Sequence, residues 1–148
     1  MIDYPSLELG NMAKRQKIWT YKPPKQPKSK VPDTIKSEVE TKARELIESI
    51  LKPDHVKAPS VNKPFNYIVD IYSKWHGNYF YFCSKYACPD PNAISPYFEA
   101  KFARLEYNGN GHFNLSYMRH TEKWWEIYFD LSIDECIAAI RDEPLFMP

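Results

Sequence analysis

The chain has 148 residues, of which 43% are hydrophobic, 26% charged and 16% aromatic, and it contains 13 prolines. This length suits one domain with a tail, and the aromatic content excludes a chain that is disordered throughout. No apolar run is long enough to cross a membrane and no signal-peptide pattern opens the chain, so we expect neither feature. Three cysteines are an odd number, which favours free thiols and a cytoplasmic location over a disulfide framework.

Charge divides the chain into a basic N-terminal arm, residues 1–32, and a single domain, residues 33–148. The arm has seven basic and two acidic side chains, a formal charge of +5, whereas the domain has 13 basic and 17 acidic ones, a charge of −4. Prolines between residues 23 and 32 predict an extended polyproline-type segment that Trp19 and Tyr21 could anchor. The sequence around Met12 resembles a translation start, so we expect residues 1–11 to be an extension without structural use.

The cations of the arm have two interpretations: they track the phosphates of a nucleic acid, or they keep a tail solvated. They are Lys14, Arg15, Lys17, Lys22, Lys25, Lys28 and Lys30.

The domain opens with a predicted helix over residues 34–51. Apolar residues recur at spacings of three and four from Ile35 to Ile50, which is typical of an amphipathic helix. Asp33 is placed to act as its N-cap, and Pro53 is expected to end it just past Leu51.

Five strands are predicted next, because the hydrophobic period changes to two. They cover residues 65–75, 79–86, 97–107, 112–119 and 124–129. The run Asn108-Gly-Asn-Gly111 is a strong hairpin signal. In the third strand the alternation changes phase, so we predict a β-bulge near Phe102–Ala103 that restores one continuous core face.

A short C-terminal helix follows Ser132, which has capping-box spacing to Glu135, and Pro144 stops it. Because the connections between strands are short, the fold class is α+β: an N-terminal helix, a five-stranded antiparallel meander and a short C-terminal helix.

Two helices can cover only one face of such a sheet, so the second face is expected to stay open. The predicted core face carries Tyr67, Val69, Ile71, Phe80, Phe82, Phe98, Phe102, Leu105, Phe113, Leu115, Trp125, Ile127 and Phe129. The predicted second face carries Asp70, Tyr72, Lys74, Tyr79, Tyr81, Lys85, Glu99, Lys101, Arg104, Glu106, Asn114, Ser116, His120, Trp124, Glu126 and Tyr128.

Aromatic and cationic side chains together can stack on and neutralise a ligand, including single-stranded nucleic acid. Three interpretations of the second face therefore stay open: an ordinary solvated surface with cross-strand pairs, a binding face for a ligand or partner, and a homodimer interface. The candidate binding residues are Tyr72, Tyr81, Arg104, Arg119, His120, Lys123 and Trp124.

The segment from Arg119 to Trp125 is the densest local candidate. Arg119 and Lys123 could grip an anion while Trp124 offers a stacking face, although a salt-bridged turn with Trp125 in the core explains the same residues. A small-molecule or enzyme pocket near Arg119 and His120 is the alternative use of this region.

The cysteines and histidines predict no metal or catalytic centre. Cys83 and Cys88 have no matching second ligand pair, which argues against zinc and favours buried free thiols. Cys83, His112 and His120 could in principle assemble a catalytic group, but residues scattered in this way occur by chance in most domains. We therefore assign no catalytic residue, metal or cofactor.

Three segments resemble a family of small uncharacterised bacterial proteins with cyanobacterial relatives. They are the run from Lys74 to Tyr86, the run from Ser95 to Tyr107 and the run from Tyr117 to Trp124, and the resemblance covers about residues 60–148. It implies one compact bacterial domain and no active site.

The sequence therefore favours a non-enzymatic binding domain for a polyanion such as nucleic acid, or for a protein partner, with a homodimer through the open sheet face as a further possibility.

Overall fold

The five predicted strands form one sheet. The computed structural model describes residues 30–56 and 65–148, so the expectations for Met12, the polyproline segment and most of the arm fall outside the described residues. The strands are β1 (Tyr67–His76), β2 (Tyr79–Ala87), β3 (Tyr97–Gly109), β4 (His112–Met118) and β5 (Trp124–Ser132). They pair antiparallel in the order β1-β2-β3-β4-β5, which confirms the predicted meander.

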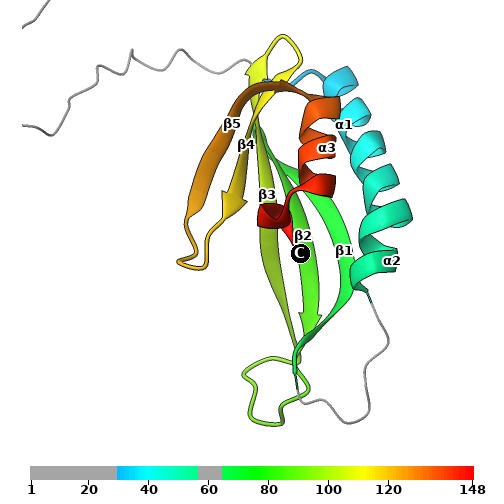
Figure 1. Cartoon of the computed structure of the whole chain (residues 1–148), viewed down its shortest axis with the longest axis vertical. Helices are drawn as coiled ribbons and strands as arrows, with labels where there is room; N and C mark the ends of the chain where they lie inside the picture. Colours follow the sequence, from blue (N-terminus) through cyan, green and yellow to red (C-terminus); the bar gives the residue numbers. More distant parts are fainter. Residues whose placement is uncertain (1–29, 57–64) are drawn as a thin grey trace, which may run out of the picture.

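The helices pack on one face of this sheet. They are α1 (Asp33–Leu46), the π-helical turn η1 (Ile47–Leu51), α2 (Lys52–His55), α3 (Ile133–Asp142) and the 3-10 turn η2 (Pro144–Phe146). In Figure 1, α1 and α3 lie side by side over the same face, and Lys42 of α1 bonds Asp134 of α3 at 2.5 Å. The α+β class predicted from the sequence is therefore confirmed.

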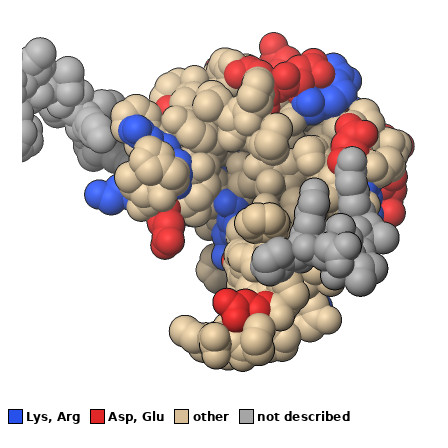
Figure 2. All heavy atoms as spheres, turned by 60° about the horizontal axis from the view of Figure 1, so that its bottom comes forward, with Lys and Arg blue, Asp and Glu red and all other residues tan. Residues whose placement is uncertain are grey.

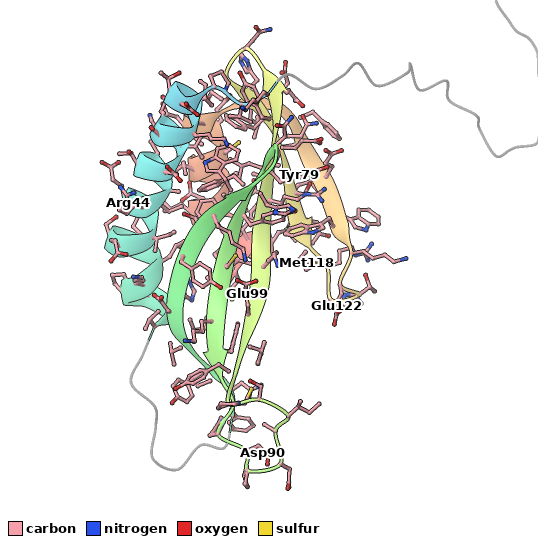
Figure 3. The ribbon with its side chains drawn as sticks, turned by 180° about the vertical axis from the view of Figure 1, so that it is seen from behind. Arg44, Tyr79, Asp90, Glu99, Met118 and Glu122 are labelled. Atoms are coloured by element: carbon pink, nitrogen blue, oxygen red, sulfur yellow. The ribbon has the colours of Figure 1, made fainter. Side chains whose placement is uncertain are left out.

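The core fills the space between this helix layer and the sheet. Its largest fully buried side chains include Phe80, Phe82, Phe113, Leu105 and Leu115, all of which the alternation places on the core face. Seen from behind, the strands face the viewer and α3 lies beyond them, so among the described residues no helix covers the second face (Figure 3).

The predicted bulge in β3 is confirmed. Phe82 pairs with Ala103 but Cys83 pairs with Lys101, which leaves Phe102 as the extra residue. Phe102, Ala103 and Leu105 are all buried as a result. The β3–β4 hairpin is also confirmed, and Gly109, Asn110 and Gly111 all adopt the positive φ that this tight turn requires.

The start and the end of the first helix differ from the prediction. Asp33 is the first helical residue, and the N-cap is Pro32 without a side-chain cap. The helix continues to His55, because the wide turn η1 lets Lys52 donate to the carbonyl of Ile47 and places Pro53 in the first turn of α2. A proline is tolerated there, since that position needs no amide donor.

The predicted core face of β1 is wrong at its start. A register shift between Ile68 and Asp70 changes the alternation, so Ile68 is buried although it is not among the predicted core residues. Tyr67 and Val69, predicted for the core, are only half-buried. One extra residue in a strand moves every side chain before it to the opposite face of the sheet.

Three further residues predicted for the core are exposed: Phe98 at 42%, Trp125 at 49% and Phe129 at 61%. Phe98, near the start of β3, stacks on its cross-strand partner Tyr86 near the end of β2. In β5 two register shifts turn Tyr128, predicted for the open face, toward Glu143 on the helix side.

Candidate functional site

The candidate site lies on the sheet face opposite α1 and α3, which we call the open face. Cross-strand partners point to the same side of a sheet. Register therefore defines one row across all five strands, formed by Lys74, Tyr81, Arg104, Ser116 and Glu126. The row beside it joins Tyr72, Cys83 and Lys101 across β1, β2 and β3.

The open face is concave. Trp124 of β5 contacts Tyr81 of β2 at 5.9 Å between ring centroids, although β3 and β4 lie between their strands. Figure 2 shows a hollow between the lobe at the left, formed by the β4–β5 hairpin, and the lower lobe, formed by the loop between β2 and β3. Blue Lys or Arg atoms are visible inside this hollow.

Arg104 occupies the centre of the open face between aromatic rings. Its guanidinium lies 4.6 Å from the ring centroid of Tyr79 and 4.9 Å from that of Trp124. Tyr79 and Tyr81 are themselves 6.1 Å apart, so the three rings and the guanidinium form one cluster. Each ring–cation contact contributes about 0.5–2 kcal/mol, which makes this cluster a preorganised stacking surface.

A second cluster is built around the carboxylate of Glu99, lower on the same face (Figure 3). Lys74 Nζ lies 3.0 Å from Oε2, Lys101 Nζ lies 3.1 Å from Oε1, and the hydroxyl of Tyr72 donates to Oε2. The Tyr72 hydrogen bond, followed by those of the two lysines, lowers the pKa of Glu99 to about 2. Burial and the same carboxylate raise the pKa of Tyr72.

The two clusters are joined. Lys101, which binds Glu99, also lies 5.7 Å from the ring centroid of Tyr81, which contacts Trp124. Further toward the end of the sheet, Lys85 lies 4.5 Å from the ring centroid of the exposed Tyr97. Cations and rings therefore alternate along the open face over β1 to β3.

The sequence-predicted site residues divide between two places. Tyr72, Tyr81, Arg104 and Trp124 meet on the open face. Arg119 instead stacks on Trp125 at 4.2 Å, on the other side of β5.

The remaining predicted residues lie outside the open-face clusters. His120 and Lys123 are exposed in the β4–β5 turn, which a 2.9 Å bond from Arg119 N to the Lys123 carbonyl closes. Of the basic arm, Lys30 is exposed at the start of the described chain, and the other six cations precede it.

Tyr79, Lys74, Glu99 and Lys101 belong to the site although sequence reasoning did not select them. The alternation had placed all four on the second face, and that is the only sequence signal they carry. Their convergence depends on the register between three strands, which composition does not show.

Two of the three thiols, those of Cys83 and Cys136, are buried. Burial raises the pKa of Cys83 to about 11 and that of Cys136 to about 12, so neither forms a thiolate readily. Among residues 30–56 and 65–148, no group of three or more His, Cys, Asp or Glu side chains is arranged to hold a metal ion. Within the same ranges no helix has the length and apolar character of a membrane span.

A groove of about 300 Å³ lies between α1–η1 and the edge strand β1. One of its two cations is already paired, since Lys52 lies 2.8 Å from Glu48 and 3.2 Å from Asp70. Arg44, labelled on α1 in Figure 3, also lines this groove. The open face therefore remains the stronger candidate, because it combines cations with aromatic rings.

These features define a class of protein: a small α+β domain in which one face of an antiparallel sheet is covered and the other is concave, aromatic and charged. The chain belongs to the family described as a domain of unknown function (DUF3024), whose model matches residues 31–148. No curated protein and no solved structure matches it.

Proposed function

We propose that this protein is a non-enzymatic binding domain that holds a single strand of nucleic acid on the open face. The supporting observation is the guanidinium of Arg104, which lies within 5 Å of the ring centroids of both Tyr79 and Trp124. Bases of single strands stack on aromatic rings and guanidinium planes, which are sequence-tolerant platforms. Trp124, Tyr79 and Tyr81 are half-buried, so part of each ring remains accessible to a ligand.

Charge supports the same ligand. Lys74, Lys85, Lys101 and Arg104 all lie on the open face beside the rings, where they can neutralise phosphates as the bases stack. The basic arm would add to this attraction, since its formal charge of +5 precedes the domain. A concave surface suits a flexible single strand better than it suits a straight duplex.

The test is equilibrium binding of a fluorescein-labelled thymidine oligonucleotide of about 12 nucleotides, measured by the fluorescence anisotropy of the label. Non-specific affinities of about 1–100 μM are expected near physiological salt. With three phosphates neutralised, affinity falls about 40-fold when salt rises from about 50 to about 300 mM. Absence of binding at the lower salt, or binding that does not respond to salt, would contradict the proposal.

Adjacent tryptophans provide a matched control. Trp124 lies on the open face and Trp125 on the other side of β5, both next to the same turn. Loss of one stacked base costs about 1–3 kcal/mol, so Trp124→Ala is expected to weaken binding at least fivefold. Trp125→Ala is expected to stay within about twofold. Equal losses in the two variants would show that the open face is not the binding surface.

A protein partner, a homodimer and a pocket near Arg119 and His120 are the competing outcomes. A homodimer would reveal itself if Trp124→Ala changed the sedimentation of the protein but not its oligonucleotide binding, and a protein partner if neither the native protein nor the variant bound the oligonucleotide. A small-molecule pocket would give binding that is nearly independent of salt, because one ligand anion replaces many phosphates.

We further propose that the protein acts in the cytoplasm of a bacterial cell. Its three cysteines are free, and Cys83 and Cys136 are buried. Reduced thiols of this kind suit a reducing compartment. Detection of the native protein in a periplasmic fraction would contradict this location.

A further inference from the structure

The Glu99 cluster has the geometry of an anion site that is already filled. Two ammonium groups and one hydroxyl converge on the same carboxylate, with contacts of 3.0 Å from Lys74 and 3.1 Å from Lys101. The hydroxyl donor is Tyr72. Three donors from β1 and β3 therefore point at one anionic group, and the chain itself supplies that group.

The cluster remains open to ligands. Side-chain exposure is 44% for Lys74, 35% for Lys101 and 30% for Glu99. Each ion pair between partly exposed side chains contributes only about 0.2–1 kcal/mol, because water competes for both partners. An incoming anion can therefore replace Glu99 without breaking a buried charge network.

A phosphodiester is the anion that fits this place. Like a carboxylate, it presents two equivalent oxygens to a pair of donors, and lysine binds phosphate as a point charge. Lys101 also lies 5.7 Å from the ring of Tyr81, so a phosphate at the cluster would adjoin a base on that ring. Tyr81 in turn contacts Trp124, on which the next base could stack.

We propose that Tyr72, Lys74 and Lys101 form a subsite for one backbone phosphate of a single strand, and that Glu99 occupies this subsite when no ligand is bound. This inference rests on the proposed function, and it assigns Glu99 a role as an internal competitor. The competitor keeps affinity low and binding readily reversible.

Removal of the competitor gives a measurable prediction. Glu99→Gln keeps the shape of the side chain and changes the charge of the cluster from +1 to +2. We expect this variant to bind the thymidine oligonucleotide about tenfold more tightly, equivalent to about 1.4 kcal/mol. The plot of log affinity against log salt is expected to steepen by about 0.7, the contribution of one more neutralised phosphate.

General charge repulsion needs a separate control. Glu126 lies on the same face and its Oε2 accepts a 3.3 Å bond from Asn114, away from the lysines. Glu126→Gln removes the same charge from the same face outside the Glu99 cluster, so its gain in affinity, expected to be about twofold and well below that of Glu99→Gln, measures the general repulsion. In a Lys74→Gln/Lys101→Gln background, Glu99→Gln is expected to bring no more than a twofold gain, because the subsite is absent. Repulsion alone would give the same or a larger gain there.

The outcomes separate the two proposals. If the native chain binds but Glu99→Gln leaves affinity unchanged, the inference is overturned while the proposed function stands. A weaker Glu99→Gln complex would also overturn it, and would indicate that the carboxylate contacts base edges. If neither protein binds the oligonucleotide, both proposals are refuted. Thermal melts establish that each variant is folded at the temperature of the assay.

Discussion

Removing the charge of Glu99 should destabilise the domain while it tightens ligand binding. The carboxylate accepts hydrogen bonds from Tyr72, Lys74 and Lys101, which lie on β1 and β3. Strands β1 and β3 are not neighbours in the sheet, so Glu99 ties the edge strand to the centre across β2. Glu99→Gln loses both ion pairs and weakens the Tyr72 bond.

The magnitude follows from the pKa of Glu99. A fall from the ordinary value of 4.5 to about 2 corresponds to at most about 3.4 kcal/mol. Because the side chain is 30% exposed, solvent screening reduces this to about 1–2 kcal/mol. The typical free energies of two partly exposed ion pairs and one hydrogen bond to a charged group add up to a similar contribution to stability.

The effect must depend on pH. A lowered folded-state pKa stabilises the protein above pH 4.5, and this stabilisation is lost as the pH falls from 4.5 toward 2. Urea denaturation of native and Glu99→Gln proteins is therefore expected to differ by about 1–2 kcal/mol at neutral pH and by less than half of that near pH 3. The same difference at both pH values would refute the electrostatic account, and Glu126→Gln serves as the control without these contacts.

Other parts of the fold make separate predictions. Ser132→Ala removes the capping box of α3 and is expected to cost about 1 kcal/mol in urea denaturation, with no effect on oligonucleotide binding. Phe80→Ala empties a fully buried position and is expected to cost about 3–5 kcal/mol by the same measurement. Alkylation of the folded protein is expected to be faster at the half-buried Cys88 than at Cys83 or Cys136, because the thiols of these two are buried. Peptide mapping by mass spectrometry measures the order of modification, and modification of Cys83 or Cys136 before Cys88 would contradict the burial argument.

Local patterns predict most of the architecture. Alternation predicts the five strands, the short connections predict their order, and the Asn-Gly-Asn-Gly run predicts one hairpin. The capping box that begins at Ser132 is predicted by the spacing of three positions to Glu135, and it is present with both of its hydrogen bonds. These features depend on residues close together in the chain, which is why sequence alone could show them.

Other features depend on contacts that no local pattern contains. The helix passes Pro53 because a π-turn shifts its hydrogen bonds, and nothing in the sequence around Ile47 marks that turn. In β5, register shifts around Ile127 and Phe129 turn Tyr128 to the helix side, where it bonds Glu143. Such bulges are fixed by what the neighbouring strand and helix require, so alternation fails there.

One bulge determines whether the proposed site can exist. Lys101 and Arg104 are three positions apart, which in a regular strand would place them on opposite faces of the sheet. The extra residue Phe102 brings both cations to the open face while its own ring enters the core. Tyr81 lies between them, paired with Arg104 by register and beneath the ammonium of Lys101. The stacking cluster contains Arg104 and the proposed phosphate subsite contains Lys101. Without the bulge these two cations would lie on opposite faces of the sheet, so the cluster and the subsite could not contact the same ligand.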